Sequence, residues 1–491
     1  MDQKEQSIAD IINGTLAAMA SLRLQKVEWV DDGEIGENNK NGSGLMKRAE
    51  ALEAIFTPAN NLFNETGEKI ITAINFTTIE KDIDYIISDV EKYGWCGAPY
   101  FDHVPEFTSF FGNEDPYKKG ETDFVDAVSF VTTTLLDYLV CSGIYGNEKE
   151  KPDGKRTKRY DKCKDLICDG VKWLVENKAD LKEKDGTIAG VFWPIGKPVK
   201  KTSTISEIPG LYFTYSSILA LTEVLNNLAE IGLVNDDRIN KDLIKEIVRD
   251  CYKWARKRVR PNPDNDDYLT VQYANFGMAE TINESAALVY ILLIFESCEP
   301  FLGEDEKIEK ENVEQIVATL KKLFDEQGAI FTEGGFAHRI MFSKGKSSIT
   351  INYDDLTIYF LLLESFCWAH DFFKRNSVSV KDIEDLKDKI DYIMKDILKL
   401  RDDKKQLWDK TMIEDVYAIY FNQRALEALT YYRQYIGDFV RGGITITQGQ
   451  LDNAIRTALM NQANNMATAV RDEVWAMLQK VKFSKLPLKE K

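Results

Sequence analysis

Two kinds of helix pattern alternate along the chain. In the first, apolar residues recur every three or four positions among charged residues, as in IEDLKDKIDYIMKDILKL at 383–400; this is typical of a helix with one buried face. In the second, nearly every position is apolar or small, as in NESAALVYILLIF at 283–295. A helix that is apolar on all sides must be buried on all sides. The pattern therefore predicts one set of helices enclosed by another.

The positions of these helices indicate a repeated pair. Amphipathic helices are expected at 161–177, 238–259, 308–325 and 381–400, and a weaker first pair at 45–56 and 78–93; the enclosed helices are expected to begin near residues 124, 211, 284, 356 and 415. The repeat is roughly 60–90 residues, longer than the common solenoid periods. This pattern favours an all-α fold, an (α/α)5-6 toroid, over an open solenoid or an irregular bundle.

Three segments depart from the repeat. Residues 1–44 are expected to form an N-terminal helix followed by a polar linker, before a toroid-like domain at 45–440. Residues 441–491 contain a long helix, either the last outer helix or a docking helix. The β-branched residues and glycines of 330–352 predict a small β-hairpin.

Composition narrows the class of protein. The chain has 491 residues, of which 44% are hydrophobic, and its seven cysteines are scattered. We expect buried, reduced thiols rather than a disulfide framework. The first ten residues lack the apolar core of a secretory signal, and the apolar runs are too short to span a bilayer. These features predict a cytoplasmic protein with no membrane partner.

The architecture resembles the α/α-toroid superfold of terpenoid cyclases, protein prenyltransferase subunits, lanthionine cyclases and six-hairpin glycosidases. YGWCGAPYF (93–101) and KDGTIAGVFWPIG (184–196) are similar to the Gly- and Trp-containing turns of those folds. The resemblance covers most of residues 45–435 and concerns architecture only, because no family motif set accompanies it and a fold does not define a function.

Acidic residues mark the starts of the enclosed helices. In a toroid these starts share one mouth, so the carboxylates there would form a ring. One interpretation is helix capping and interaction with the helix dipole. The alternative is general acid/base chemistry on a carbohydrate, as in six-hairpin glycosidases. The catalytic candidates are Asp126, Glu284, Asp355 and Asp415, and the aromatic candidates for stacking on a ligand are Trp95, Trp193, Tyr212, Tyr215 and Tyr353.

Two further patterns give weaker indications of chemistry. DNDD at 264–267 is the acid motif of class II terpenoid cyclases, but its Pro- and Asn-rich surroundings favour a solvated turn, where an Asp is a weak acid. The three histidines and the cysteines show no metal-ligand spacing, so we predict no metal and no cofactor. Phosphate-binding glycine loops and a GxSxG elbow are also absent from the sequence.

A group of cations stands out in a chain of net charge −17. Three segments supply them, at 151–164, 197–201 and 253–260. They could cluster into a basic face for phosphate or nucleic acid, or simply complement helix C-termini. The net charge opposes general nucleic-acid binding. The candidates are Lys155, Arg156, Arg159, Lys200, Lys201, Arg256, Lys257, Arg258 and Arg260.

These observations favour a non-catalytic binding or scaffold subunit of an intracellular multi-protein assembly, with protein partners and with room for a small-molecule or glycan ligand. The alternative is a carbohydrate-active enzyme that uses two carboxylates at the toroid mouth. A terpenoid-cyclase-like protein and a local nucleic-acid or phosphate binder are further alternatives.

Overall fold

The computed structural model describes most of the chain between residues 7 and 438. The described residues are 7–22, 45–64, 67–72, 74–95, 122–145, 154–182, 186, 188–194, 196–198, 210–262, 265–271, 278–282, 284–303, 306–327, 338–344, 347–353, 355–408 and 419–438.

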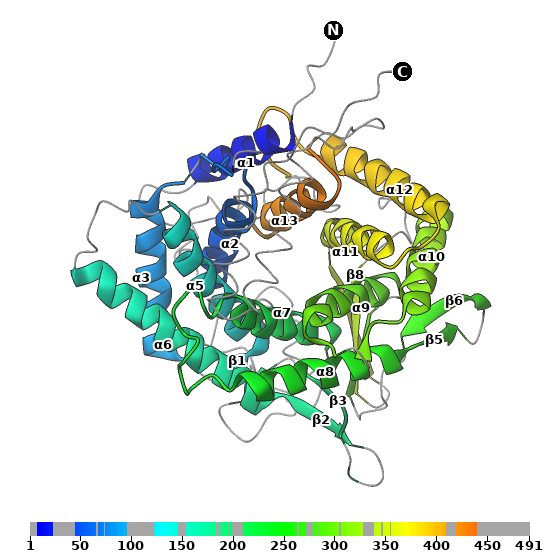
Figure 1. The fold of residues 1–491 in the computed structure, drawn as a ribbon, viewed down its shortest axis with the longest axis horizontal. Helices are drawn as coiled ribbons and strands as arrows, with labels where there is room; N and C mark the ends of the chain where they lie inside the picture. The colour runs from blue at the N-terminus through cyan, green and yellow to red at the C-terminus, as the bar shows by residue number, and fades with distance from the viewer. Residues whose placement is uncertain are drawn as a thin grey trace, which may run out of the picture.

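Six helices form a closed inner ring (Figure 1). Each packs against the next in chain order, and the last packs against the first. The ring therefore has no free edge. Its members are α2 (Leu45–Asn61), α5 (Val125–Tyr145), α7 (Leu211–Asn227), α9 (Glu284–Cys298), α11 (Asp355–Arg375) and α13 (Ile419–Tyr435).

A second set of helices surrounds this ring (Figure 1). Each packs on the outside of the inner helix that precedes it in the chain. The two helix types expected from the sequence thus occupy the inside and the outside, and the all-α class is confirmed. The outer helices are α3 (Phe76–Tyr93), α6 (Gly154–Asn177), α8 (Lys241–Arg258), α10 (Lys310–Gln327) and α12 (Val380–Lys399).

The difference in composition follows from this placement. In α9, every residue from 286 to 295 is buried, because the helix is covered by its ring neighbours and by the outer layer. In α12, Leu386, Ile390 and Ile393 are buried, whereas Asp388 between them is exposed; Asp391 is buried as well and accepts a hydrogen bond from the Tyr432 hydroxyl. Burial of a leucine or isoleucine side chain contributes about 1.5–3 kcal/mol, so the apolar stripe fixes how α12 lies on α11.

Helix α1 (Ile8–Leu22) lies on the outside of α13, next to α2. The backbone N–H of Ile8 donates to the carbonyl oxygen of Asp438 (3.0 Å), and the Thr15 hydroxyl donates to the carbonyl oxygen of Gln406 (3.0 Å). Arg401 donates to the Thr15 hydroxyl. The N-terminal helix thus covers the last inner helix. The alternative outer helix, expected within 441–491, lies outside the described residues.

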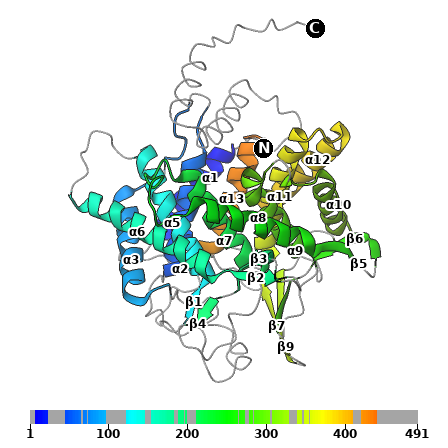
Figure 2. The same ribbon diagram turned by 60° about the horizontal axis from the view of Figure 1, so that its bottom comes forward.

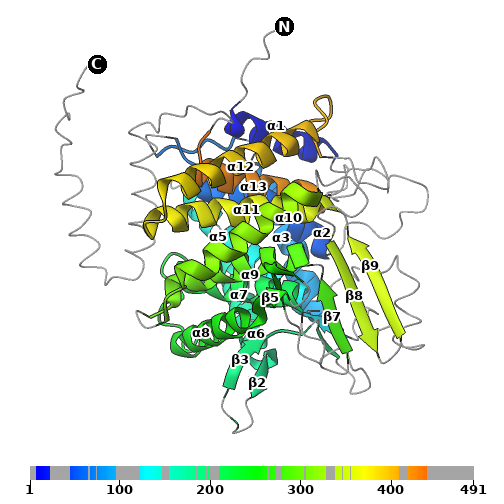
Figure 3. The same ribbon diagram turned by 90° about the vertical axis from the view of Figure 1, so that its right-hand side faces the viewer.

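Short antiparallel strands occupy connections that lead from an outer helix toward the next inner helix. The predicted hairpin near 330–352 is present as strands β8 and β9, and β7 extends it to three strands; Figure 3 shows this sheet at one end of the ring. The pairs are β1 (Thr122–Phe124) with β4 (Gly196–Pro198), β2 (Ala179–Lys182) with β3 (Ile188–Phe192), β5 (Val259–Asn262) with β6 (Asn265–Val271), and β7 (Met278–Ile282) with β8 (His338–Lys344) and β9 (Ser347–Tyr353).

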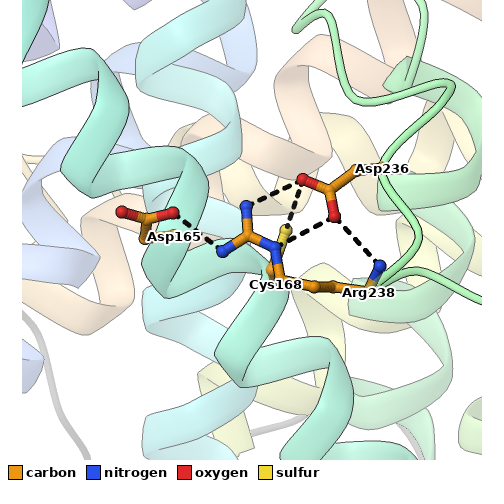
Figure 4. A network of polar contacts seen from close by, with 4 residues as sticks. All are labelled: Asp165, Cys168, Asp236 and Arg238. Atoms are coloured by element: carbon orange, nitrogen blue, oxygen red, sulfur yellow. Dashed lines mark hydrogen bonds and ion pairs between the residues drawn. The ribbon is translucent and has the colours of Figure 1, made fainter.

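An exposed polar network joins the α7–α8 connection to α6 (Figure 4). Arg238 donates to Asp165 of α6 (2.8 Å) and to Asp236 (2.7 Å). The guanidinium of Arg238 lowers the pKa of the Asp236 carboxyl to about 2. Because these groups are largely exposed, the network contributes little to stability and mainly orients the connection.

One described helix, Val125–Ile144 within α5, is long and apolar enough to cross a bilayer. Core helices pass the same test, and most of this segment is buried inside the protein. Figure 2 shows α5 from a second direction, among the helices it packs against. Its apolarity is accounted for by its position in the inner ring.

Strand β3 packs directly on the backbone of α8 at Gly190. A Cβ atom at this position would come within 2.8 Å of the Cα atom of Trp254 and within 2.4 Å of its Cβ atom. We expect Gly190→Ala to lower the free energy of unfolding by roughly 1–3 kcal/mol, because the strand and helix must separate. Urea denaturation measures the effect.

Gly143→Ala is the matched control, since Gly143 lies in α5 and a Cβ atom there would meet nothing within 4 Å. Alanine is favoured over glycine in a helix by about 1 kcal/mol, so this variant should be as stable as the wild type or more so. Equal destabilisation by both substitutions would contradict the close approach of β3 to α8.

Candidate functional site: the interior of the inner ring

The acids predicted at the mouth of the ring are only partly described. Asp126 lies in the first turn of α5, and Glu284 and Asp355 are the first residues of α9 and α11. The side chains of Glu284 and Asp355, and all of Asp415, lie outside the described residues. The starts of these helices are therefore placed, but a carboxylate pair at the mouth stays a prediction.

Asp126 accepts a local backbone hydrogen bond, and its carboxyl group has a raised pKa. Its Oδ1 atom accepts a hydrogen bond from the N–H of Ala127 (2.9 Å), and its side chain is buried. Burial raises the pKa of Asp126 to about 6. A carboxyl with this pKa exchanges a proton close to neutral pH.

The aromatic candidates divide into core and interior residues. Trp193 is fully buried and its indole N–H donates to the carbonyl of Leu174, so it belongs to the core. Trp95 is also buried and packs near Gly170 of α6. Tyr212 and Tyr215 both pack against Tyr290 of α9, on the neighbouring inner helix. The Tyr353 side chain lies outside the described residues.

The described members of the predicted basic face lie on more than one outer helix. Arg159 lies near the start of α6, whereas Arg256 and Arg258 lie in the last turn of α8. Each outer helix follows one inner helix and leads to the next, so α6 and α8 run in the same direction. Arg159 thus lies on a different outer helix from Arg256 and Arg258 and toward the other helix end, and a single basic cluster stays a prediction.

The same cations already have local roles. Arg159 donates two hydrogen bonds to Asp84 of α3 (2.6 and 2.8 Å), and Arg256 pairs with Glu309. The Arg258 guanidinium lies 5.4 Å from the centre of the Trp254 ring. Lys257 and Arg260 are exposed; Lys200 and Lys201 lie outside the described residues, as do the side chains of Lys155 and Arg156.

The last three residues of the DNDD motif open β6, which pairs with β5, and Asp264 lies outside the described residues. This hairpin extends from the C-terminus of α8 and projects at the periphery of the ring in Figure 1. The described part of the motif is thus in a hairpin and does not lie in the interior.

The cysteine thiols and the histidine ring in the described part of the chain do not form a candidate metal or catalytic site. Six cysteines are described, and all are buried and free. Burial raises the pKa of Cys168 to about 11, so it remains a thiol. Burial lowers the pKa of His370 to about 3, so its ring is neutral. No group of three potential metal ligands occurs among the described residues.

The strongest polar feature is a set of carboxylates inside the ring, which the sequence analysis missed. Each of the six inner helices supplies one acid. Several of these acids interact electrostatically although their helices are not neighbours, as Glu53 of α2 does with Glu223 of α7. Such interactions can only cross the interior of the ring. The six acids are Glu53, Asp137, Glu223, Glu296, Glu364 and Glu427.

Five of these carboxyl groups hold their protons more firmly than exposed acids do. Burial raises the pKa of Asp137 to about 6. Burial, followed by repulsion from neighbouring carboxylates, raises the pKa of Glu53, Glu223, Glu296 and Glu364 well above the usual range. Strongly perturbed acids in one place are typical of functional sites, although structural networks also produce them.

Solvent still reaches part of this acidic set. Glu53 and Glu364 are buried, whereas Asp137, Glu223 and Glu427 are half-buried. These three side chains expose part of their surface to solvent, although the residues next to them in the helices are mostly buried. The interior at these positions is therefore not sealed by apolar side chains.

Arg424 of α13 is a cation placed among these acids. Its Nη1 atom donates to Oε2 of Glu427 (2.6 Å), and its guanidinium lies 5.4 Å from the centre of the Tyr420 ring. Arg424 also interacts electrostatically with Glu364. One arginine cannot neutralise six carboxylates, so the set keeps a strong acidic excess when its members are ionised.

A sequence signal for these acids exists in retrospect. Each lies in a stretch that is otherwise mostly apolar or small, as in LLDYLV for Asp137, LTEVL for Glu223 and LLLESF for Glu364. Burial of a carboxylate among apolar side chains costs free energy, because the charged group loses its contact with water. A single carboxylate within an enclosed helix is therefore expected to face a polar space. Its recurrence in successive inner helices was the pattern to look for.

No protein-family model matches this chain, and no curated protein sequence matches it. The similarity to α/α toroids therefore stays one of architecture.

The acidic interior predicts a specific dependence of stability on pH. A carboxyl whose pKa is raised by folding stabilises the fold below its unfolded pKa, and this contribution is lost as pH rises through the folded pKa. We expect Glu223→Gln and Glu364→Gln each to raise the free energy of unfolding by roughly 1–3 kcal/mol at pH 8. The gain should shrink toward pH 5. Denaturation at both pH values measures it.

Glu384→Gln is the matched control, because Glu384 is exposed on α12. This substitution should change stability by less than about 0.5 kcal/mol at either pH. If the two interior variants were less stable than the wild type at pH 8, the carboxylates would be stabilising the ring, contrary to the present interpretation.

Proposed function

We propose that the chain is an (α/α)6 toroid that acts as a non-catalytic binding subunit of an intracellular assembly and takes a small polar ligand into the interior of its ring. The observation that carries this proposal is that each inner helix places one carboxyl group toward the interior of the ring. Buried polar groups are normally satisfied by partners. The interior carboxyl groups are only partly paired with cations, and solvent reaches some of them. A ligand that enters the ring can therefore supply their remaining partners.

The toroid assignment is supported by the order of packing. Six helices pack in chain order, the last returns to the first, and α1 covers the outside of α13. Ligand sites of folds with this architecture lie in concave spaces lined by several elements. Here the interior combines carboxylates with the hydroxyl-bearing rings of Tyr212 and Tyr215.

Asp126 supports a second candidate, a carbohydrate-active enzyme. Its pKa of about 6 would let it donate a proton near neutral pH, and it interacts electrostatically with Tyr212. Such an enzyme needs a second carboxylate, about 5–10 Å away. Glu284 and Asp355 stay the candidates for that role. Glycan hydrolysis by the wild type that is abolished in Asp126→Asn would favour this candidate.

Thermal unfolding of the full chain against a panel of amines, polyols, sugars and organic acids tests the binding function. A ligand present at 100 times its dissociation constant should stabilise the protein by about 2.7 kcal/mol. We expect at least one such ligand for the wild type and a lost or reduced shift in the double variant Glu223→Gln/Glu364→Gln.

The Glu384→Gln variant should respond like the wild type. A ligand that stabilises the double variant as strongly as the wild type would show that binding does not use the interior acids. The absence of any stabilising ligand from the whole panel would likewise contradict the proposal.

A further inference from the structure

We propose, building on the function proposed above, that the ring binds an organic cation with two or more separated amino groups, an aliphatic diamine or polyamine. The inference deepens the binding function by naming the chemical class of ligand. It follows from the arrangement of the interior acids, from hydrogen-bonding atoms left open among them, and from the absence of metal-binding geometry in the described residues.

The acids fall into two groups within the ring. The first group, from α2, α5 and α7, consists of Glu53, Asp137 and Glu223, which interact with one another. The second, from α9 and α11, consists of Glu296 and Glu364. Glu427 of α13 interacts with members of both groups. A ligand with one cationic group would neutralise one group of acids and leave the other unpaired.

Arg424 and Glu427 form an ion pair, and Glu427 interacts with members of both acidic groups. Because Glu427 is already bound by Arg424, it supplies less attraction for an added cation than the other acids do. Near the second group, Arg375 is bound by Glu299 and Asp371. Among the described residues, each group thus has more carboxyl groups than cations placed beside them.

Hydrogen-bond acceptors remain open inside this set. Glu364 is only 2% exposed, and its Oε1 atom has no hydrogen-bond partner among the described residues. The Oε1 atom of the buried Gln423, next to Arg424, is open in the same way. Buried acceptors without donors are costly. An ammonium group supplies three donors and a positive charge at once.

Other ligand classes fit this arrangement less well. Three potential ligands for a metal ion do not converge anywhere in the described part of the chain. A neutral sugar could donate hydrogen bonds but would leave the like charges unpaired. The rings of Tyr212 and Tyr215 interact electrostatically with interior charged groups and could add cation–π attraction to an ammonium group.

Binding of such a cation should release protons. Glu53 and Glu223 in the first group, and Glu296 and Glu364 in the second, hold protons more firmly than exposed acids, and an adjacent positive charge favours their ionised form. At neutral pH, the bound amine therefore displaces protons from the ring into the buffer. A neutral ligand that only forms hydrogen bonds would not displace these protons into the buffer.

Isothermal titration calorimetry of the full chain tests the inference, with putrescine and spermidine as probes and butylamine as a single-cation comparison. At pH 7, we expect saturable putrescine and spermidine binding whose measured heat depends on the ionisation enthalpy of the buffer, showing proton release. Butylamine should bind at least about tenfold more weakly, because it fills one acidic group only.

Glu223→Gln and Glu364→Gln remove one carboxylate from each group, and each should weaken spermidine binding by about tenfold or more. Glu384→Gln should bind spermidine as the wild type does. Equal affinity for butylamine and putrescine, or unchanged binding in both interior variants, would overturn the inference.

The two proposals fail in different ways. If a neutral sugar or polyol stabilised the wild type but not the double interior variant, and neither polyamine bound, the inference would be wrong while the binding function stood. If neither polyamines nor any member of the ligand panel bound to the interior, both proposals would be wrong.

Discussion

The closure of the inner ring is the constraint on which the rest of the structure depends. Because each inner helix packs against two neighbours and is covered by outer helices, nearly all of its surface must be apolar. The one remaining side faces the interior of the ring. A polar residue on that side can interact with polar residues of several other inner helices, as Glu53 does with Asp137, Glu223 and Glu427. Closure thus turns isolated carboxylates, far apart in the chain, into one acidic set.

The same constraint explains the outer layer. An outer helix needs one apolar stripe, which fixes its rotation on the inner helix beneath it, while its other faces carry the charged residues that give the chain its acidity. Local ion pairs such as Arg159 with Asp84 connect neighbouring outer helices. Such pairs give cations of the outer helices local roles.

The sequence pattern predicted both types of helix, but it did not predict the set of carboxyl groups in the interior of the ring. The 3.6-residue period and the uniformly apolar stretches identify both helix types because burial depends on side-chain chemistry alone. The covering of α13 by α1 could not be foreseen, since it rests on hydrogen bonds between residues about 390 apart. Attention to helix starts selected Asp126 but overlooked Glu364, because a single acid in an apolar helix gains meaning only when the ring closes.

The central claim is that Glu223 and Glu364 hold their protons more firmly than exposed acids do, because closure of the ring buries them and places other carboxyl groups near them. Infrared spectroscopy of the carbonyl stretch of protonated carboxylic acids tests this most directly. At pH 7, the account predicts a protonated-acid band in the wild-type protein that weakens in Glu223→Gln and Glu364→Gln and persists in Glu384→Gln. A wild-type spectrum without that band at pH 7 would contradict the account.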